Sequence, residues 1–167
     1  MTGQAFRLLR EIEIPERGSV ARSYVHDRTG LEVLSLTNGD VNRCFGIAFR
    51  TETPDDTGIG HVLEHVVLCG SRRYPSTAPF AELLKGSLQT HLNAATLPDM
   101  TVFKAASRNL RDFYNLFDVY LDAVLHPLLR ETTFRQEGWH IEPSEEDGRP
   151  AGFGGVVYNE MKGAYGH

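Results

Sequence analysis

Apolar residues recur along this chain with two spacings, and each spacing predicts one type of element. Between residues 20 and 50 the chain is rich in β-formers, and large apolar residues alternate with smaller ones at Phe45, Ile47 and Phe49. A period of two is typical of a strand with one buried face. The turn signal Asn38-Gly39-Asp40 predicts a hairpin between two strands, 31–36 and 41–50.

Helical spacing begins after the polar loop that follows these strands. Apolar residues then recur at i, i+3, i+4, i+7 and i+8, which predicts a helix with a core-facing stripe made of Ile59, Val62, Leu63, Val66 and Val67. Gly70 supplies the stop signal of this helix. A second helix is predicted over 79–88, with a proline in its first turn and three residues directed inward, Phe80, Leu83 and Leu84.

Two more strands and a long helix are predicted in the middle of the chain. Residues 91–97 and 101–106 have strand character, and a turn at Pro98-Asp99 joins them. The longest helix is predicted over 107–125 and ends before Pro127.

The order of the elements predicts the fold class. Residues 144–155 form an acidic, glycine-rich loop, and a last helix is predicted over 156–165. Trp139 is assigned to the core. Strands followed by helices with interposed strands indicate an α+β fold, in which helices cover one face of a mixed or antiparallel sheet. The whole chain, 1–167, has the length of one compact domain.

Composition and charge narrow the classes of partner. Hydrophobic residues make up 41% and charged residues 23% of the chain, an ordinary globular mixture. A net charge of −5 argues against nucleic acid, and no apolar run approaches the roughly 20 residues that a membrane span needs. Two cysteines, Cys44 and Cys69, make no disulfide framework and fit a reducing compartment. We expect a cytoplasmic location, with an organellar matrix as the alternative.

The strongest chemical signal is the stretch His61-Val62-Leu63-Glu64-His65, an H-x-x-E-H pattern. Residues four apart on a helix project from one face, so both imidazoles can bind a single ion. Glu64 is three residues past His61 and shares that face. The simpler interpretation is a helix with two satisfied histidines and a chance glutamate, since short motifs recur by accident.

A catalytic zinc needs a third protein ligand and an open position for water. Such a metal makes water reactive near neutral pH, and a neighbouring carboxylate takes the proton and passes it to the leaving amine. Glu64 is placed for the carboxylate role. The third ligand should be an acid on a later helix, and Glu160 is the candidate, although by itself it would read as a solvent-facing helix residue.

The chain resembles the pitrilysin/insulinase metallopeptidases, and within them most closely the presequence protease subfamily. The resemblance extends from the region of Leu31 to the C-terminus. It is carried by the H-x-x-E-H stretch and by blocks that follow it in order: 68–75, 82–88, 92–94, 98–99, 112–116, 118–124, 136–140 and 158–163. It implies the mitochondrial-processing-peptidase-like metallohydrolase fold.

The resemblance also implies roles for individual residues. It makes His61, His65 and Glu160 the ligands of one zinc ion and Glu64 the general base. It makes Leu92-Asn93-Ala94 an edge strand that binds substrate, and an extended peptide can pair with such an edge through backbone hydrogen bonds. The alternative for Asn93 is a turn residue at a strand end.

Two further residues near the motif have weaker claims. His91 shares a strand face with Asn93, and a structural or surface role is favoured over metal binding. The family tends to have an apolar or aromatic residue there, so His91 departs from the pattern and could alter specificity. Cys69 lies one helical turn past His65, where a packed thiol is favoured over a thiolate ligand.

These observations predict a zinc metalloendopeptidase that hydrolyses short unstructured peptides, such as targeting presequences. Family members are several times longer, so the chain is expected to be an N-terminal peptidase domain whose partners are its peptide substrate and the remaining C-terminal half of the same polypeptide. The isolated chain is expected to bind metal with little turnover. The alternatives are a binding or assembly module with a structural zinc and a different zinc hydrolase. Imidazole and carboxylate ligands would also accept manganese or cobalt.

Overall fold

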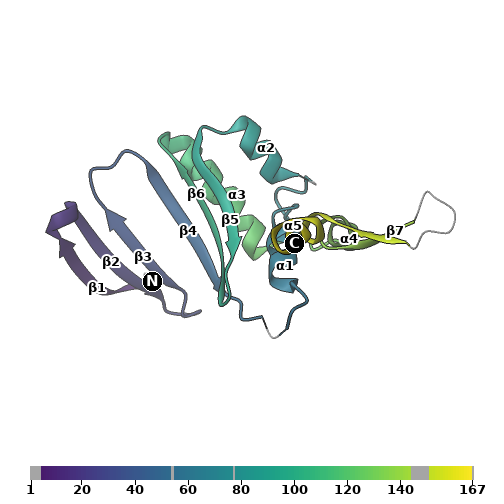
Figure 1. The fold of residues 1–167 in the computed structure, drawn as a ribbon. Helices are drawn as coiled ribbons and strands as arrows, with labels where there is room; N and C mark the ends of the chain where they lie inside the picture. Colours follow the sequence, from purple (N-terminus) through teal and green to yellow (C-terminus); the bar gives the residue numbers. More distant parts are fainter. Residues whose placement is uncertain (1–4, 54, 77, 144–150, 167) are drawn as a thin grey trace. The chain divides into compact units, whose positions relative to one another are not determined.

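The computed structural model describes residues 5–53, 55–76, 78–143 and 151–166, which belong to two compact units, Met1–Val41 and Asn42–His167 (Figure 1). In the first unit, three antiparallel strands form a sheet in the order β1-β2-β3, with bounds Phe6–Ile14, Ser19–His26 and Glu32–Thr37. The prediction of one peptidase domain over residues 1–167 stays a prediction.

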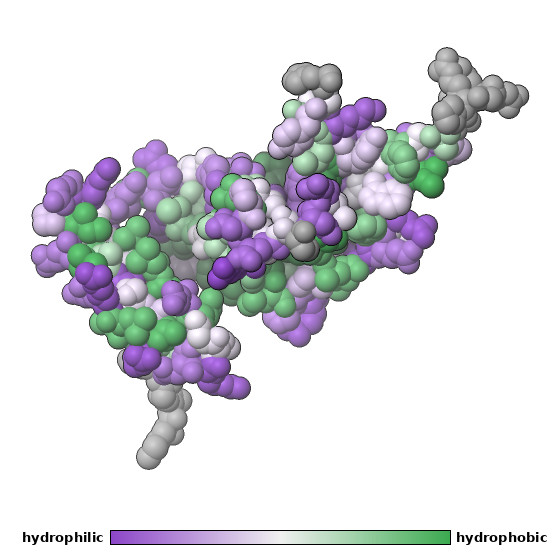
Figure 2. All heavy atoms as spheres, turned by 60° about the horizontal axis from the view of Figure 1, so that its bottom comes forward, coloured by the Kyte–Doolittle hydropathy of each residue, from purple (hydrophilic) through white to green (hydrophobic). Residues whose placement is uncertain are grey.

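Strand β1 was not predicted from the sequence, because its pairing with β2 is irregular. The register shifts between Leu8 and Arg10, and this β-bulge breaks the period of two that identifies a strand. A short 3-10 turn, Pro15–Arg17, leads into β2 through Gly18, whose φ of 51° is left-handed. Figure 2 shows apolar side chains on the surface of this unit; among the exposed ones are Phe6, Leu8, Val33, Leu34 and Leu36.

The turn of the hairpin predicted at Asn38-Gly39-Asp40 is present. The Asn38 side chain accepts a hydrogen bond of 2.9 Å from the amide of Asp40. Within the first unit β3 pairs with β2, and within the second unit β4 (Arg43–Arg50) pairs with β6. The pairing of β3 with β4, which belong to different units, stays a prediction.

The second unit is built on an antiparallel sheet in the order β4-β6-β5. Strands β5 (Gln89–Thr96) and β6 (Met100–Ser107) are joined by the turn predicted at Pro98-Asp99. The helices are α1 to α5, with bounds Ile59–Val67, Pro79–Gly86, Leu110–Leu125, Glu131–Glu137 and Val156–Tyr165. A small two-stranded sheet pairs β7 (His140–Glu142) with β8 (Gly152–Gly154).

The core of this unit lies between the sheet and the helices. Phe103 and Ala105 on β6 pack against Leu116 and Tyr120 on α3, and all four are at most 3% exposed. Every second residue of β4 and β5 adds to this face, and so do apolar residues of α1 and α2. Helices thus cover one face of an antiparallel sheet, which confirms the predicted α+β class.

Several predicted core positions are instead exposed. Leu84 on α2 and Trp139 are 47% and 52% exposed, and the indole of Trp139 packs edge-on against Phe153. On α1, Val62 and Val66 are buried, whereas Ile59 and Leu63 are more than 40% exposed. Apolar spacing located the helices but overestimated the width of the face that each one buries.

From the sequence, no segment of the chain was expected to span a membrane. No helix in the described parts of the chain combines the length and the apolar character that a membrane crossing requires.

Candidate metal centre

Helix α1 presents two imidazoles from neighbouring turns. It begins after Gly58, whose φ of 70° lets the chain enter the helix through a left-handed residue. The rings of His61 and His65 lie with centroids 5.0 Å apart, and both side chains are about three-quarters buried. The four-residue spacing of the motif therefore produces the shared face that the sequence predicted.

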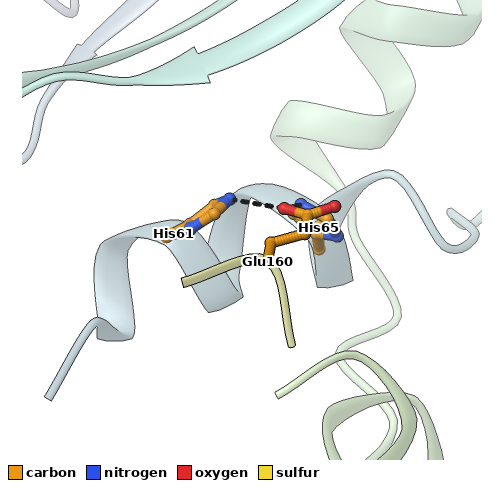
Figure 3. Close-up of side chains that lie close together, drawn as sticks. All are labelled: His61, His65 and Glu160. Atoms are coloured by element: carbon orange, nitrogen blue, oxygen red, sulfur yellow. Dashed lines mark ion pairs between the residues drawn. The ribbon is translucent and has the colours of Figure 1, made fainter. Parts of the chain in front are cut away.

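Helix α5 brings Glu160 to the same place (Figure 3). Its oxygen Oε2 lies 3.4 Å from Nε2 of His61 and 3.6 Å from Nε2 of His65. The helix is held there because Val157 packs against Val62 and Val66 of α1. It begins directly after Gly155, where a Cβ would collide with the carbonyl of Gly138.

The three side chains fit a small divalent metal ion. One donor atom from each lies within 4.8 Å of the others. A tetrahedral zinc with bonds of 2.0–2.1 Å would separate its ligand atoms by about 3.3 Å, close to the two histidine–carboxylate distances above. Imidazole nitrogen and carboxylate oxygen are ordinary zinc ligands.

Glu137 on α4 sets the orientation of one of these imidazoles. Its Oε2 lies 3.1 Å from Nδ1 of His65 and is largely buried. A proton on Nδ1 that is donated to this carboxylate leaves Nε2 as the acceptor, facing Glu160. Sequence reasoning gave Glu137 no role because α4 was not predicted. In the sequence, only the family resemblance of residues 136–140 drew attention to Glu137.

Glu64 does not belong to the three-residue cluster, although it lines the same cavity as the two histidines. It is 7% exposed, and its Oε2 accepts a hydrogen bond of 2.6 Å from the hydroxyl of Thr96, the last residue of β5. Sequence spacing missed Thr96 because the contact crosses from a helix to a strand. The other oxygen, Oε1, accepts no hydrogen bond among the described residues and remains available for chemistry.

These groups line one cavity of about 490 Å³. Five elements contribute to its walls: α1, α2, β5, α4 and α5. Three carboxylates lie on it, and Leu68, Ala78, Phe80 and Ala81 make part of it apolar. The cavity can therefore hold a metal ion and leave room for a bound chain beside it.

The predicted substrate strand lies at the edge of the sheet. Within the described residues β5 pairs only with β6, so its outer backbone groups are not used by the sheet. Leu92 and Ala94 pack toward the core, whereas Asn93 is exposed, and Asn93 and Ala94 reach the cavity. His91 is exposed and does not line the cavity.

Cys69 lines the cavity beside Glu137 but does not belong to the three-residue cluster. The pKa of its thiol is raised to about 11, chiefly by burial and in addition by the charge of Glu137 and a hydrogen bond to that carboxylate. A thiol with this pKa stays protonated at neutral pH, which agrees with the expected packed thiol.

We expect Cys69 to react slowly with iodoacetamide in the metal-free chain. With a pKa of about 11, about one thiol in a thousand is ionised at pH 8, and only the thiolate is alkylated. Glu137→Gln should speed the reaction, because it removes a negative charge that disfavours the thiolate. Mass spectrometry of alkylated peptides measures both rates, and the exposed Cys44 is the internal standard. Equal rates at the two cysteines, or a slower Cys69 in the variant, would contradict this account.

Comparisons with known proteins place the chain among peptidases. Residues 45–146 match the family model described as insulinase, peptidase family M16. The chain is 54% identical over 165 residues to "Presequence protease 1, chloroplastic/mitochondrial" of Arabidopsis thaliana, which covers 96% of this chain. It is 50% identical over 164 residues to "Protein HypA" of Clostridium perfringens, again over 96% of this chain.

A solved structure has the same fold. The crystal structure of pitrilysin matches 77% of this chain with a TM-score of 0.67 and 26% sequence identity. The chain spans only 15% of the Arabidopsis relative, 16% of the Clostridium relative and 14% of the pitrilysin chain. The matched family model ends before Glu160, so that match does not include α5.

Proposed function

The chain belongs to the insulinase family of peptidases, family M16, and from this premise we propose that it is the metal-binding segment of a zinc-dependent endopeptidase. In this proposal His61, His65 and Glu160 hold one zinc ion, and Glu64 is the general base. The segment works as part of a longer polypeptide, as its share of the relatives' length suggests.

One observation carries the proposal: the three candidate ligands and a buried glutamate line the same cavity. His61, His65 and Glu160 converge from two helices that are far apart in the sequence. Glu64 lies on the same cavity without joining the cluster. A purely structural metal site has no need for a carboxylate that stands beside the ligands with one oxygen unengaged.

The chain's own residues would divide the chemistry between them. A zinc ion, when bound, would lower the pKa of a water molecule, so that this water can attack the peptide carbonyl near neutral pH, and it would also polarise that carbonyl. Glu64 would accept the proton of that water on Oε1 and deliver it to the leaving amine. Glu137 would keep His65 in the tautomer that leaves Nε2 free for the metal.

Strand β5 would hold the substrate. A peptide that pairs with the outer edge at Leu92-Asn93-Ala94 uses backbone groups, so the edge can accept many sequences as long as they are extended. Folded proteins do not offer such a strand, and short unstructured peptides do. The name of the Arabidopsis relative supports targeting presequences as one class.

The compartment also stays a proposal. The name of the Arabidopsis relative places that protein in chloroplasts and mitochondria, which supports an organellar matrix. The cytoplasmic location expected from the sequence stays a prediction.

Peptide hydrolysis by the full-length polypeptide and by the isolated chain tests the proposal. We expect the full-length protein to cleave an unstructured presequence-like peptide, to stop when a chelator removes the metal, and to recover when one equivalent of zinc is added. The isolated chain should bind zinc but turn over slowly, because it lacks most of the length of its relatives. Chelator-resistant cleavage would contradict the metal mechanism, and efficient cleavage by the isolated chain would contradict the need for the remaining polypeptide.

A further inference from the structure

The carboxylate of Glu64 depends on contacts from the sheet for its orientation. Glu64 is on the sheet side of α1, and a buried carboxylate needs hydrogen-bond partners there. The hydrogen bond from Thr96 to Oε2, at 2.6 Å, is short, as expected when a hydroxyl donates to an ionised acceptor. A glutamate side chain has three rotatable bonds, so without this contact the carboxylate could adopt other directions.

Two more threonines extend this contact into the sheet. Thr101 of β6 lies opposite Thr96 in the strand register, with their hydroxyl oxygens 3.5 Å apart. Thr51, just after β4, lies 2.8 Å from Thr101. A hydroxyl has one proton, so while Thr96 donates to Glu64, only Thr101 can be the donor in the 3.5 Å contact between the two threonines. Either hydroxyl can donate in the 2.8 Å contact between Thr51 and Thr101, and the 3.5 Å contact is the weakest of the three.

The same strand would hold both the substrate and the base. Thr96 is two residues beyond Ala94 and directs its side chain to the same face of β5. A peptide paired along the outer edge of β5 would therefore be fixed to the strand that also orients the carboxylate. The distance between the base and the substrate backbone would then depend on β5 and on the single hydrogen bond that joins Thr96 to Glu64.

We propose that Thr96 is a positioning residue for the general base: its hydroxyl holds Oε2 of Glu64 so that Oε1 faces the cavity where water and substrate meet. The inference rests on the proposed function of Glu64. Thr96 is not one of the candidate metal ligands. Its hydroxyl also lies 3.4 Å from the carbonyl oxygen of Gly60 on α1, a longer and weaker contact than the 2.6 Å hydrogen bond to Glu64.

Threonine variants of the full-length enzyme test this assignment. Thr96→Val keeps the shape of the side chain and removes the hydroxyl, Thr96→Ser keeps the hydroxyl, and Thr90→Val is the matched control. Thr90 is on the same strand, but its hydroxyl donates to Asn42 instead. The measurements are kcat, KM, zinc content and thermal stability, with a crystal structure of the Thr96→Val form of this chain.

We expect Thr96→Val to lower kcat by about 10- to 100-fold, with KM changed less than about threefold and one zinc per chain retained. Thr96→Ser should recover most of kcat, Thr90→Val should equal the wild type, and Thr101→Val should have a smaller effect because its contact is longer. The crystal structure should show the Glu64 carboxylate turned from its wild-type direction.

Other results would overturn the assignment. An unchanged kcat in Thr96→Val, a serine variant as impaired as the valine variant, or an unmoved carboxylate would show that the hydroxyl does not position Glu64. Loss of zinc in Thr96→Val would show a merely structural role. Failure of the proposed function gives a different signature: Glu64→Gln would then retain wild-type turnover, and the Thr96 assignment would fall with it.

Discussion

Replacing Glu64 with glutamine is expected to lower kcat for peptide hydrolysis by about 10²- to 10⁴-fold, the range that a positioned general base contributes. Glutamine preserves the size of the side chain and can still accept the hydrogen bond from Thr96, but it cannot take a proton from water. Zinc content should stay at one per chain because Glu64 is outside the ligand cluster. Steady-state kinetics and metal analysis of the full-length variant measure both quantities.

The matched control for this result is Glu131→Gln on α4. Its side chain is 76% exposed and pairs with Arg135 at the surface, where an ion pair contributes little to stability. We expect wild-type kinetics from it. A Glu64→Gln enzyme that keeps more than a tenth of wild-type kcat would contradict the role of Glu64, and one that loses its zinc would make Glu64 a part of the metal site.

The second large effect is expected at the metal. Glu160→Gln and His65→Ala should each weaken zinc binding by the isolated chain, because each removes one of three protein ligands. Glu137→Gln should weaken it less, by about 10- to 100-fold, since Glu137 acts through His65. Competition titration with a chromophoric chelator measures the affinities, with Glu131→Gln again as the control. Tight zinc binding that is insensitive to Glu160→Gln would place the third ligand elsewhere.

Local spacing was sufficient to predict that the two histidines of the motif lie side by side. His61 and His65 share a face of α1 because a helix has 3.6 residues per turn, and no tertiary information is needed for that. The assignment of Glu160 to the site required more information than local spacing. The predicted helix 156–165 matches α5, but only the resemblance to a family connected it with α1, because spacing says nothing about which helices meet.

Contacts that cross between elements escaped sequence reasoning. Glu137 and Thr96 contact the site from α4 and β5, and neither has a local pattern that distinguishes it from a surface glutamate or a strand threonine. The pairing of β6 with β4 has the same origin. The turn at Pro98-Asp99 predicted that β5 meets β6, whereas no local pattern predicted that β6 also pairs with β4. Trp139 shows that hydrophobicity alone does not predict burial, since its large apolar ring is half exposed.

X-ray absorption at the zinc edge of the purified, zinc-loaded chain tests the central claim most directly, because it reports the atoms bound to the metal. The account predicts one zinc per chain with only nitrogen and oxygen neighbours at about 2.0–2.2 Å, including the scattering pattern of two imidazoles. A sulfur neighbour at about 2.3 Å would bring Cys69 into the site and contradict the ligand set of His61, His65 and Glu160.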